Sequence, residues 1–291
     1  MNSTKGEKIF YGINYFVLLL IGLTCVLPLV HVLAMSFSDK HAIASGAVSL
    51  WPVNFDSSGY SALFDETPIF KAFRNSLIIT VVGTALNVLF TVLAAYPLSK
   101  RYFIGRRFYS LAVVFTMLFT AGLIPNYLLL KSLGLLNSYG ALWLPGLVSV
   151  WNLMILRSFF EGLPEELEEA ARIDGSSEWR LLSQIILPLS GPVIAAISLF
   201  YGVTHWNAFM NVLIYINDTN RQNLTVLVQQ LIQNQSFMQE MANTQPEMAA
   251  KLTPEGVKAA GVIVMTLPML VLYPFLQKYF VKGAMIGAVK G

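Results

Sequence analysis

Six apolar segments, each about as long as a membrane-spanning helix, alternate with polar stretches along the chain. A helix needs about 20 residues to cross ~30 Å of hydrocarbon, and each segment reaches that length. They cover residues 13–37, 75–99, 108–130, 139–159, 186–206 and 257–277. The pattern predicts an all-α membrane protein with six transmembrane helices, which form a single transmembrane domain over residues 1–291.

Breaks and kinks are also expected from the residues within these segments. Gly122 and Pro125 lie near the end of the third segment, which is therefore expected to break there. Prolines in the other segments are either packing kinks or hinges, since membrane helices tolerate them. The first apolar run is too long for the ~7–15 apolar residues of a signal peptide and contains Pro28, so we expect a retained helix.

The composition agrees with a membrane protein. Hydrophobic residues make up 55% of the chain and charged residues 12%, whereas a soluble domain carries about 25% charged residues. The net charge of +3 is small and dispersed, so nothing in it indicates a nucleic-acid partner. The single cysteine, Cys25, lies in the first apolar segment and has no intrachain disulfide partner.

Lysine and arginine residues set the expected orientation. Twelve of them fall on one side of the six segments: Lys5, Lys8, Lys100, Arg101, Arg106, Arg107, Arg157, Arg172, Arg180, Lys278, Lys282 and Lys290. Seven, spread over longer loops, fall on the other: Lys40, Lys71, Arg74, Lys131, Arg221, Lys251 and Lys258. We therefore expect a multi-pass protein of the cytoplasmic membrane with both termini in the cytoplasm.

A charged hairpin, residues 163–188, lies between the fourth and fifth apolar segments. Pro164 suits the first position of a helix, and the glutamates that follow are favoured at the positive end of its dipole. Gly175 can take the left-handed conformation that ends a helix. Ser176 or Ser177 can cap a second short helix. The sequence predicts two helices joined at Gly175.

Each hairpin helix has an expected apolar face. On the first helix, two adjacent alanines would let another surface approach the backbone closely; the face consists of Leu163, Leu167, Ala170 and Ala171. On the second, the face leads into Leu187 and Pro188 and consists of Trp179, Leu182, Ile185 and Ile186.

The hairpin also carries a spaced motif. Glu169-Ala170-Ala171, Gly175 and Ile185-Ile186-Leu187-Pro188 fall on the spacing EAA-x3-G-x9-I-x-L-P. This spacing resembles the cytoplasmic coupling loop of ABC-importer permeases, the element that docks into a separate ATPase. Residues 73–77, 96–99, 164–171 and 277–291 resemble the carbohydrate branch, closest to the maltose-type second permease subunits and to an oligosaccharide/lipoprotein-type subgroup of Gram-positive bacteria.

This resemblance implies a type I importer permease that moves an oligosaccharide, a polysaccharide breakdown product, by ATP-driven alternating access. The implied partners are a second homologous permease in a heterodimer, two ABC ATPase subunits and an extracytoplasmic solute-binding protein. The residues that would couple to the ATPase are Glu169, Ala170, Ala171, Asp174, Gly175, Leu187 and Pro188. Glu169 would pair with a basic residue of the ATPase, and residues 207–256 would form a long extracytoplasmic loop.

Missing motifs support this division of labour. The chain has no G-x4-G-K-[ST] loop, so ATP and Mg are expected on the partner ATPase and no cofactor on this chain. It lacks H-E-x-x-H and G-x-S-x-G, and we expect a transport subunit rather than an enzyme. The six segments contain no Asp or Glu, which disfavours an ion-coupled carrier. Two alternatives remain: a permease of this architecture for another solute, and the carrier.

Sugar sites pair aromatic faces with amides, which suggests candidates for the substrate pathway: Asn126, Tyr127, Trp151, Asn152, Trp206 and Asn207. Each has another explanation, since Trp and Tyr form interfacial belts and buried Asn bonds across helices. We interpret His31 and His205 as structural. Within the loop of residues 207–256, an amphipathic helix is expected, with its apolar residues at Leu224, Leu227, Val228, Leu231 and Ile232. That loop either packs on its own protein or receives the binding protein.

Overall fold

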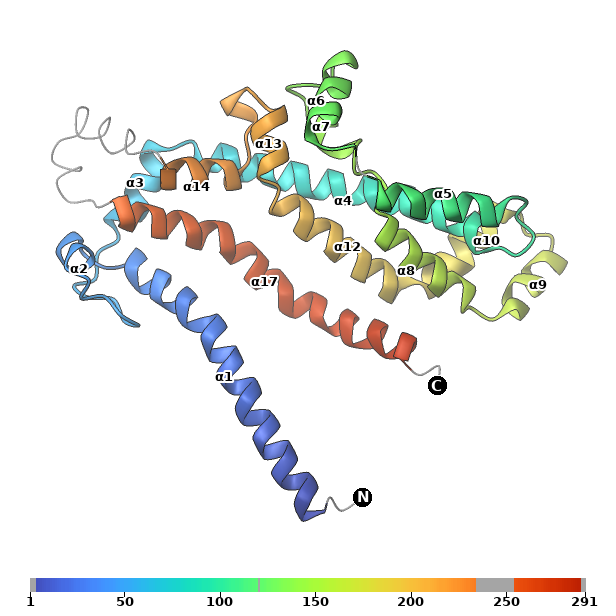
Figure 1. The fold of residues 1–291 in the computed structure, drawn as a ribbon, viewed down its shortest axis with the longest axis horizontal. Coiled ribbons are helices and arrows are strands. Elements are labelled where there is room, and N and C mark those ends of the chain that lie inside the picture. The colour runs from blue at the N-terminus through green and yellow to red at the C-terminus, as the bar shows by residue number, and fades with distance from the viewer. Residues whose placement is uncertain (1–3, 120, 234–253, 289–291) are drawn as a thin grey trace. The chain divides into compact units, whose positions relative to one another are not determined.

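The computed structural model describes residues 4–119, 121–233 and 254–288, and these residues are mostly helical (Figure 1). Two compact units make up the chain. Unit 1 comprises residues 1–69 and 227–267, and unit 2 comprises residues 70–226 and 268–291. The expected helical architecture is confirmed.

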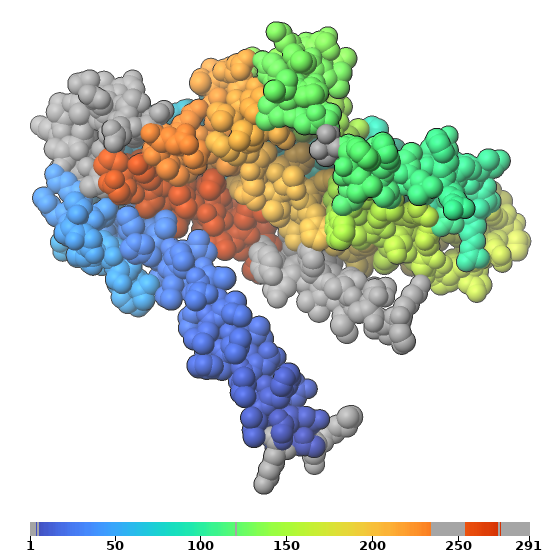
Figure 2. Space-filling view, in the orientation of Figure 1, coloured from blue at the N-terminus to red at the C-terminus, as the bar shows by residue number. Residues whose placement is uncertain are grey.

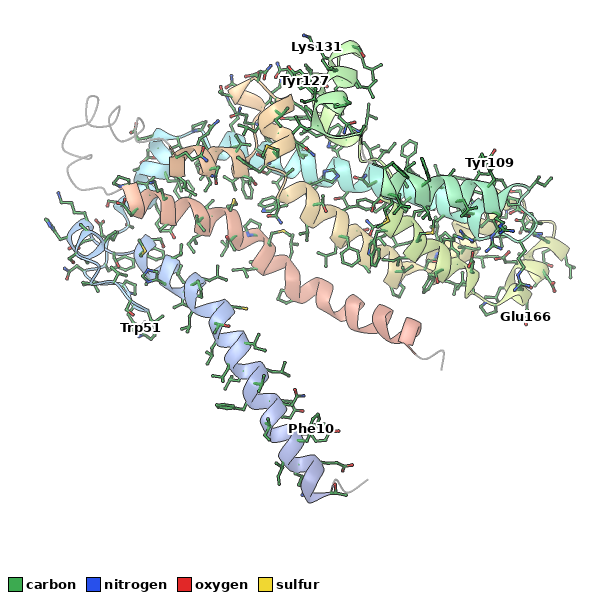
Figure 3. All side chains as sticks on the ribbon, in the orientation of Figure 1. Phe10, Trp51, Tyr109, Tyr127, Lys131 and Glu166 are labelled. Carbon is green, nitrogen blue, oxygen red and sulfur yellow. The ribbon has the colours of Figure 1, made fainter. Side chains whose placement is uncertain are left out.

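Unit 1 begins with a long apolar helix. Its elements are α1 (Lys5–Ser36), α2 (Lys40–Ala44), α3 (Ser58–Glu66), most of α14 (Leu224–Gln233) and the first part of α17 (Pro254–Ala288). Thr4 and Glu7 form a capping box at the start of α1. Large apolar side chains of α1, such as Phe10, are exposed (Figure 3). That exposure suits a helix that faces lipid.

Unit 2 contains the hairpin and the helices that support it. Its elements outside the hairpin are α4 (Ile69–Ser99, from Phe70 on), α5 (Arg106–Leu118), α6 (Leu123–Ser132), α7 (Gly140–Trp143), α8 (Val150–Glu161), α12 (Gly191–Trp206), α13 (Met210–Tyr215) and a 3-10 turn, Thr219–Arg221. Helix α8 packs against α5 and α12, and α13 packs against α7. In the space-filling view α5 and α8 lie directly against each other (Figure 2).

The core of unit 2 lies beside the hairpin. Leu153, Leu156 and Phe160 of α8 are almost fully buried and form a cluster with Leu181 and Ile186 of the hairpin. Burying one such side chain contributes about 1.5–3 kcal/mol. The hairpin is therefore anchored in the same apolar core as the long helices.

Among the described residues, three helices are long and apolar enough to cross a membrane: Gly6–Ser36, Ile69–Ser99 and Pro254–Leu272. Two further pairs qualify if each is one bent span: α5 with α6, bent by 113°, and Glu178–Leu189 with Gly191–Trp206, bent by 82°. The expected break in the third segment is confirmed, because α5 ends at Leu118 and α6 begins after Gly122, whose φ is +82°.

The fourth apolar segment, 139–159, differs from one continuous helix. It contains α7 and α8, separated by residues 144–149. Pro145 explains the interruption, since a proline inside a helix removes a backbone donor and clashes with the preceding turn. The expected amphipathic helix within residues 207–256 is confirmed as α14. Leu224, Val228 and Leu231 are buried there, and residues 234–253 of that loop lie outside the described part.

Candidate functional site

The hairpin folds as two helices around a left-handed glycine. Helix α9 (Glu165–Ile173) begins after Pro164 and α10 (Glu178–Leu181) after Ser177, whose hydroxyl accepts from the Arg180 amide. Gly175 has φ +74°. Its amide donates to the Arg172 carbonyl at 3.0 Å, and the Ser176 amide donates to the Ala171 carbonyl at 2.9 Å. These two bonds form a Schellman motif, so the predicted helix end at Gly175 is confirmed.

The second helix of the hairpin turns into the next span without a loop. After α10 come a π-helical turn (Leu182–Ile186) and α11 (Leu187–Leu189), which contains the motif residues Leu187 and Pro188. The chain then bends by 82° into α12.

Of the four residues in the predicted apolar face of the second helix, Leu182 and Ile186 are buried and Trp179 is 66% exposed. The buried residues at this part of the hairpin are Leu181 and Leu182, whereas the Glu178 side chain is 53% exposed. Two tyrosine hydroxyls and an arginine bind the Glu178 carboxylate.

The outward face of α9 is free. Glu166, Glu169, Ala170 and Ile173, spaced i, i+3, i+4 and i+7, are all exposed, and Glu166 points away from the helix (Figure 3). Among the described residues no side chain pairs with the Glu169 carboxylate. Of the four residues in the predicted apolar face only Ala171 is buried. The two alanines are thus divided: Ala171 packs inward, and Ala170 stays accessible to another surface.

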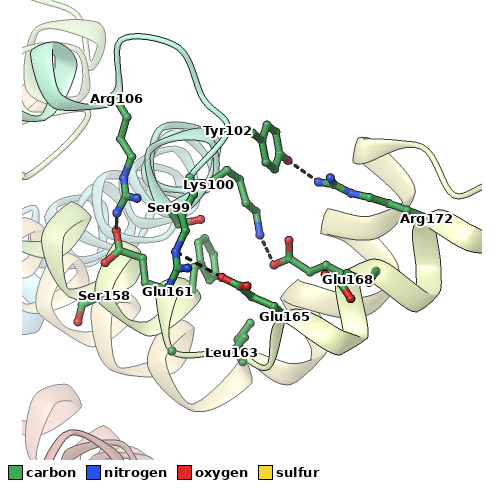
Figure 4. Close-up of a pocket in the computed structure, with 14 residues that line it drawn as sticks. Ser99, Lys100, Tyr102, Arg106, Ser158, Glu161, Leu163, Glu165, Glu168 and Arg172 are labelled. Atoms are coloured by element: carbon green, nitrogen blue, oxygen red, sulfur yellow. Dashed lines mark hydrogen bonds and ion pairs between the residues drawn. The ribbon is translucent and has the colours of Figure 1, made fainter.

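The inward face of α9 is fixed by a buried ion pair. Lys100 directly follows the last residue of α4, and its ammonium group contacts the Glu168 carboxylate (Figure 4). The Lys100 side chain is 6% exposed and that of Glu168 17%. A second pair, Arg101 with Glu165 at 3.4 Å, lies in solvent. The pair of Lys100 and Glu168 is the more strongly coupled of the two, because the Lys100 ammonium group is buried and the Glu168 carboxylate is largely shielded from water.

Glu178 forms a second connection between the hairpin and α4. The hydroxyls of Tyr96 and Tyr102 donate to one carboxylate oxygen at 2.6 and 3.0 Å, and Arg172 pairs with the other at 2.9 Å. Arg172 also donates to the Tyr102 hydroxyl at 2.7 Å. Burial, with the bond to Glu178, raises the pKa of Tyr102, so its phenol keeps the proton that it donates.

A cavity of about 490 Å³ lies between the loop after α4 and the α8–α9 connection (Figure 4). On its α8 side, Glu161 binds both Arg106 and Arg157, and Arg157 also donates to Ser110 at 2.6 Å. Three ion pairs line the cavity, together with Glu169 and with Arg172, whose partner Glu178 lies outside it. Among the described residues no cluster suits a metal ion. The site offers exposed carboxylates to a basic surface.

The six predicted pathway residues do not gather in one place. Tyr127 stacks on Tyr215 of α13, with Asn126 half-buried beside it, while Trp206 is buried edge-on to Phe73 of α4. Trp151 and Asn207 are exposed. None of the six lines the cavity of Figure 4.

Asn152 differs from the other five, because it is buried and its side-chain oxygen has no hydrogen-bond partner among the residues that the structure describes. The two histidines interpreted as structural each contact another part of the protein: His31 contacts the Ser49 carbonyl and His205 contacts Asn87.

Sequence reasoning missed the residues that tie the hairpin to α4: Tyr96, Lys100, Tyr102 and Glu178. One signal was available, since Lys100 follows directly on an apolar helix and precedes a second basic residue. Nothing local pairs Lys100 with Glu168, because the two lie 68 residues apart.

Comparison with known proteins gives near-complete matches. The polygalacturonan/rhamnogalacturonan transport system permease protein YtcP of Bacillus subtilis is 43% identical over 98% of this chain and 99% of its own. Protein LplC of the same organism is 41% identical over 100% and 98%.

A solved bacterial ABC transporter involved in the import of the acidic polysaccharide alginate contains a similar chain. It is 28% identical, with a TM-score of 0.87, over 96% of this chain and 99% of that one. The family model for the inner membrane component of binding-protein-dependent transport systems matches residues 87–285, which include the hairpin. The chain is therefore a multi-pass membrane protein that belongs to the family of inner membrane components of binding-protein-dependent transport systems.

Proposed function

We propose that this chain moves an oligosaccharide, released from a larger polysaccharide, across the cytoplasmic membrane. The observation that carries the proposal is the 43% identity, over nearly the whole length, to a permease named for polygalacturonan and rhamnogalacturonan transport. The structural similarity to a chain of an alginate importer supports the same class of substrate. Membership of this family, together with the similarity to a chain of a solved ABC transporter, argues against the ion-coupled carrier.

The partners follow from this role. The chain pairs with a second, homologous permease, receives its sugar from an extracytoplasmic binding protein, and works with two ABC ATPase subunits that bind ATP and Mg. Both termini and the hairpin face the cytoplasm, since lysine and arginine concentrate on that side. The loop of residues 207–256 lies on the opposite side.

The ATPase binds the outward face of α9. This face offers the unpaired carboxylates of Glu166 and Glu169 beside the small, accessible Ala170. A partner surface can therefore approach the helix closely while a basic residue pairs with Glu169. The Schellman turn at Gly175 holds α9 at a fixed angle to α10, and Asp174, Leu187 and Pro188 continue the same element.

Alternating access follows from that contact. Closure of the ATPase dimer on ATP draws α9 with it, and the helices attached to the hairpin rearrange so that the pathway opens toward the binding protein. Hydrolysis then allows the return. The chain supplies the docking face and the pathway, while the chemistry of ATP occurs on the partner.

Two experiments test the proposal. The binding protein that delivers substrate to this transporter is titrated with oligogalacturonides, oligosaccharides of other polysaccharides and peptides. Sugar binding is expected, and binding of peptides alone would overturn the substrate class. The complete transporter is then purified with Glu169→Lys and, as a matched control on the same helix, Glu165→Gln. Loss of ATPase association only in Glu169→Lys is expected, and retention in both would overturn the docking face.

A further inference from the structure

We propose that α4 transmits displacement of the hairpin to the break between α7 and α8, with Lys100 and Asn87 as the positioning residues at its two attachments. The inference rests on the proposed function, because it assumes that the hairpin is moved by a partner. It goes further in naming the route by which that movement reaches the helices around the break.

The first attachment joins the end of α4 to both helices of the hairpin. Tyr96 bonds Glu178 of α10, and Lys100, one turn later, pairs with Glu168 of α9. The Lys100 ammonium also lies 4.6 Å from the centre of the Tyr96 ring. Because Lys100 is buried and Glu168 is partly buried, separating them would leave the Lys100 charge uncompensated and shielded from water. The hairpin therefore cannot move without this end of α4.

The second attachment lies nine residues earlier than Tyr96, about 13 Å along the helix at 1.5 Å per residue. The Asn87 side-chain amide donates to the carbonyls of Gly146 and Leu147 at 2.6 and 2.8 Å, and Asn87 is 1% exposed. Both carbonyls belong to the nonhelical segment of residues 144–149 between α7 and α8. Asn87 thus replaces the hydrogen bonds that this segment does not make within a helix.

A further turn of α4 supports the same segment. The Thr91 and Tyr201 hydroxyls lie 2.7 Å apart, and the Tyr201 hydroxyl accepts from the Ser149 amide at 2.9 Å. The side-chain oxygen of Asn87 makes a separate contact and lies 2.5 Å from His205 Nε2. Since the amide nitrogen serves the two carbonyls, this oxygen accepts and His205 donates. Helix α4 thereby binds the broken segment and α12 together.

With these attachments, the nonhelical segment between α7 and α8 is the part of the route that can change shape most easily. Helix α4 is continuous from Ile69 to Ser99, so a displacement at Lys100 is carried along it to Asn87. Residues 144–149 have no helical ladder that resists a change of shape, and buried side chains of α4 and α12 hold their backbone groups. Irregular backbone in a membrane protein is tolerated where protein groups satisfy it, and such breaks can line a pathway.

The test uses the complete transporter in proteoliposomes: this chain, its partner permease, the ATPase subunits and the binding protein. Two quantities are measured for each variant, the amount of ATPase that copurifies and the ratio of ATP hydrolysis with and without binding protein. The variants are Lys100→Met at the first attachment and Asn87→Leu at the second. The control is Arg101→Gln, which removes the exposed neighbouring ion pair.

Both attachment variants are expected to keep the ATPase bound and to lose about five- to tenfold of the stimulation, within the usual range of coupling between sites. Arg101→Gln is expected to keep both quantities. The charge-exchanged double variant Lys100→Glu with Glu168→Lys is expected to recover stimulation, which a general loss of folding would not do. If Asn87→Leu fails to assemble, Thr91→Val provides another test of the second attachment, because valine preserves the shape of threonine. For Thr91→Val we expect a reduced ratio of ATP hydrolysis with and without binding protein.

Two results would overturn the inference. The first is full stimulation of ATP hydrolysis by the binding protein in Lys100→Met and in either Asn87→Leu or Thr91→Val. The second is a loss of stimulation in Arg101→Gln as large as the loss in the attachment variants. These results are separable from failure of the proposed function, which Glu169→Lys reports. If that variant loses the ATPase while the α4 variants remain stimulated, the docking face stands and the α4 route falls.

Discussion

The ammonium group of Lys100 and the carboxylate of Glu168 form a buried ion pair across 68 residues of sequence. The pair joins the end of α4 to the first helix of the hairpin. Its position matters more than its net energy, because a buried pair recovers little beyond its own desolvation. What it adds is geometry: α9 can lie at the end of α4 in one arrangement only.

Removing one partner of this pair is expected to destabilise the protein strongly. Glu168→Gln leaves the Lys100 charge buried, which costs about 3–5 kcal/mol. Glu165→Gln, on the same helix, breaks only the exposed pair with Arg101 and is expected to cost less than about 1 kcal/mol. Thermal unfolding of the purified transporter measures both. Equal shifts in the two variants would show that burial does not distinguish the pairs.

Gly175 is expected to tolerate asparagine better than alanine. An added Cβ meets nothing within 4 Å, so the cost of substitution comes from its φ of +74° and not from crowding. Alanine in the left-handed region costs about 1–2 kcal/mol, whereas asparagine visits it more readily. Circular dichroism melts of the two variants give the comparison. A Gly175→Ala protein as stable as Gly175→Asn would contradict the conformational argument.

Gly83 is expected to resist enlargement, because α4 and α12 approach closely there. A Cβ on Gly83 would lie 2.6 Å from His205 Nε2, a distance that forces the imidazole to move and strains its contact with Asn87. Gly83→Ala should destabilise by about 1–3 kcal/mol, as overpacking does.

Gly202→Ala supplies the control for Gly83→Ala on the facing helix, since its Cβ would lie 3.6 Å from Thr84 Oγ1 in ordinary contact. Unfolding in denaturant measures both variants. Rescue of Gly83→Ala by His205→Ala would identify the imidazole as the obstacle; a similar loss in Gly202→Ala would point to a general intolerance of the helix pair.

The proposed orientation predicts which cysteines a membrane-impermeant maleimide reaches. In a Cys25→Ala background, Glu166→Cys reports on the hairpin and Trp51→Cys on the polar segment after α1; both positions are exposed (Figure 3). Intact cells should label only Trp51→Cys, and inside-out vesicles only Glu166→Cys. The reverse pattern would overturn the assignment from the lysine and arginine count.

Much of the hairpin was predictable because its signals are local. Pro164, Gly175 and Ser177 each act on backbone within a few residues, and the structure confirms the helix start, the left-handed turn and the second cap. The face of the second helix was predicted less well. Leu182 and Ile186 of the predicted face are buried, whereas Trp179 is exposed, and tyrosines distant in the sequence bind the Glu178 carboxylate.

The sequence by itself determined the helical membrane architecture, the break at Gly122, the hairpin and the family motif, because apolar run length, backbone-restricting residues and motif spacing are all read within one stretch of chain. Only the tertiary structure decided which groups pair across distance: Lys100 with Glu168, and Asn87 with the carbonyls of Gly146 and Leu147. A polar side chain in an apolar segment shows that a partner must exist. Which partner it meets depends on how the helices pack.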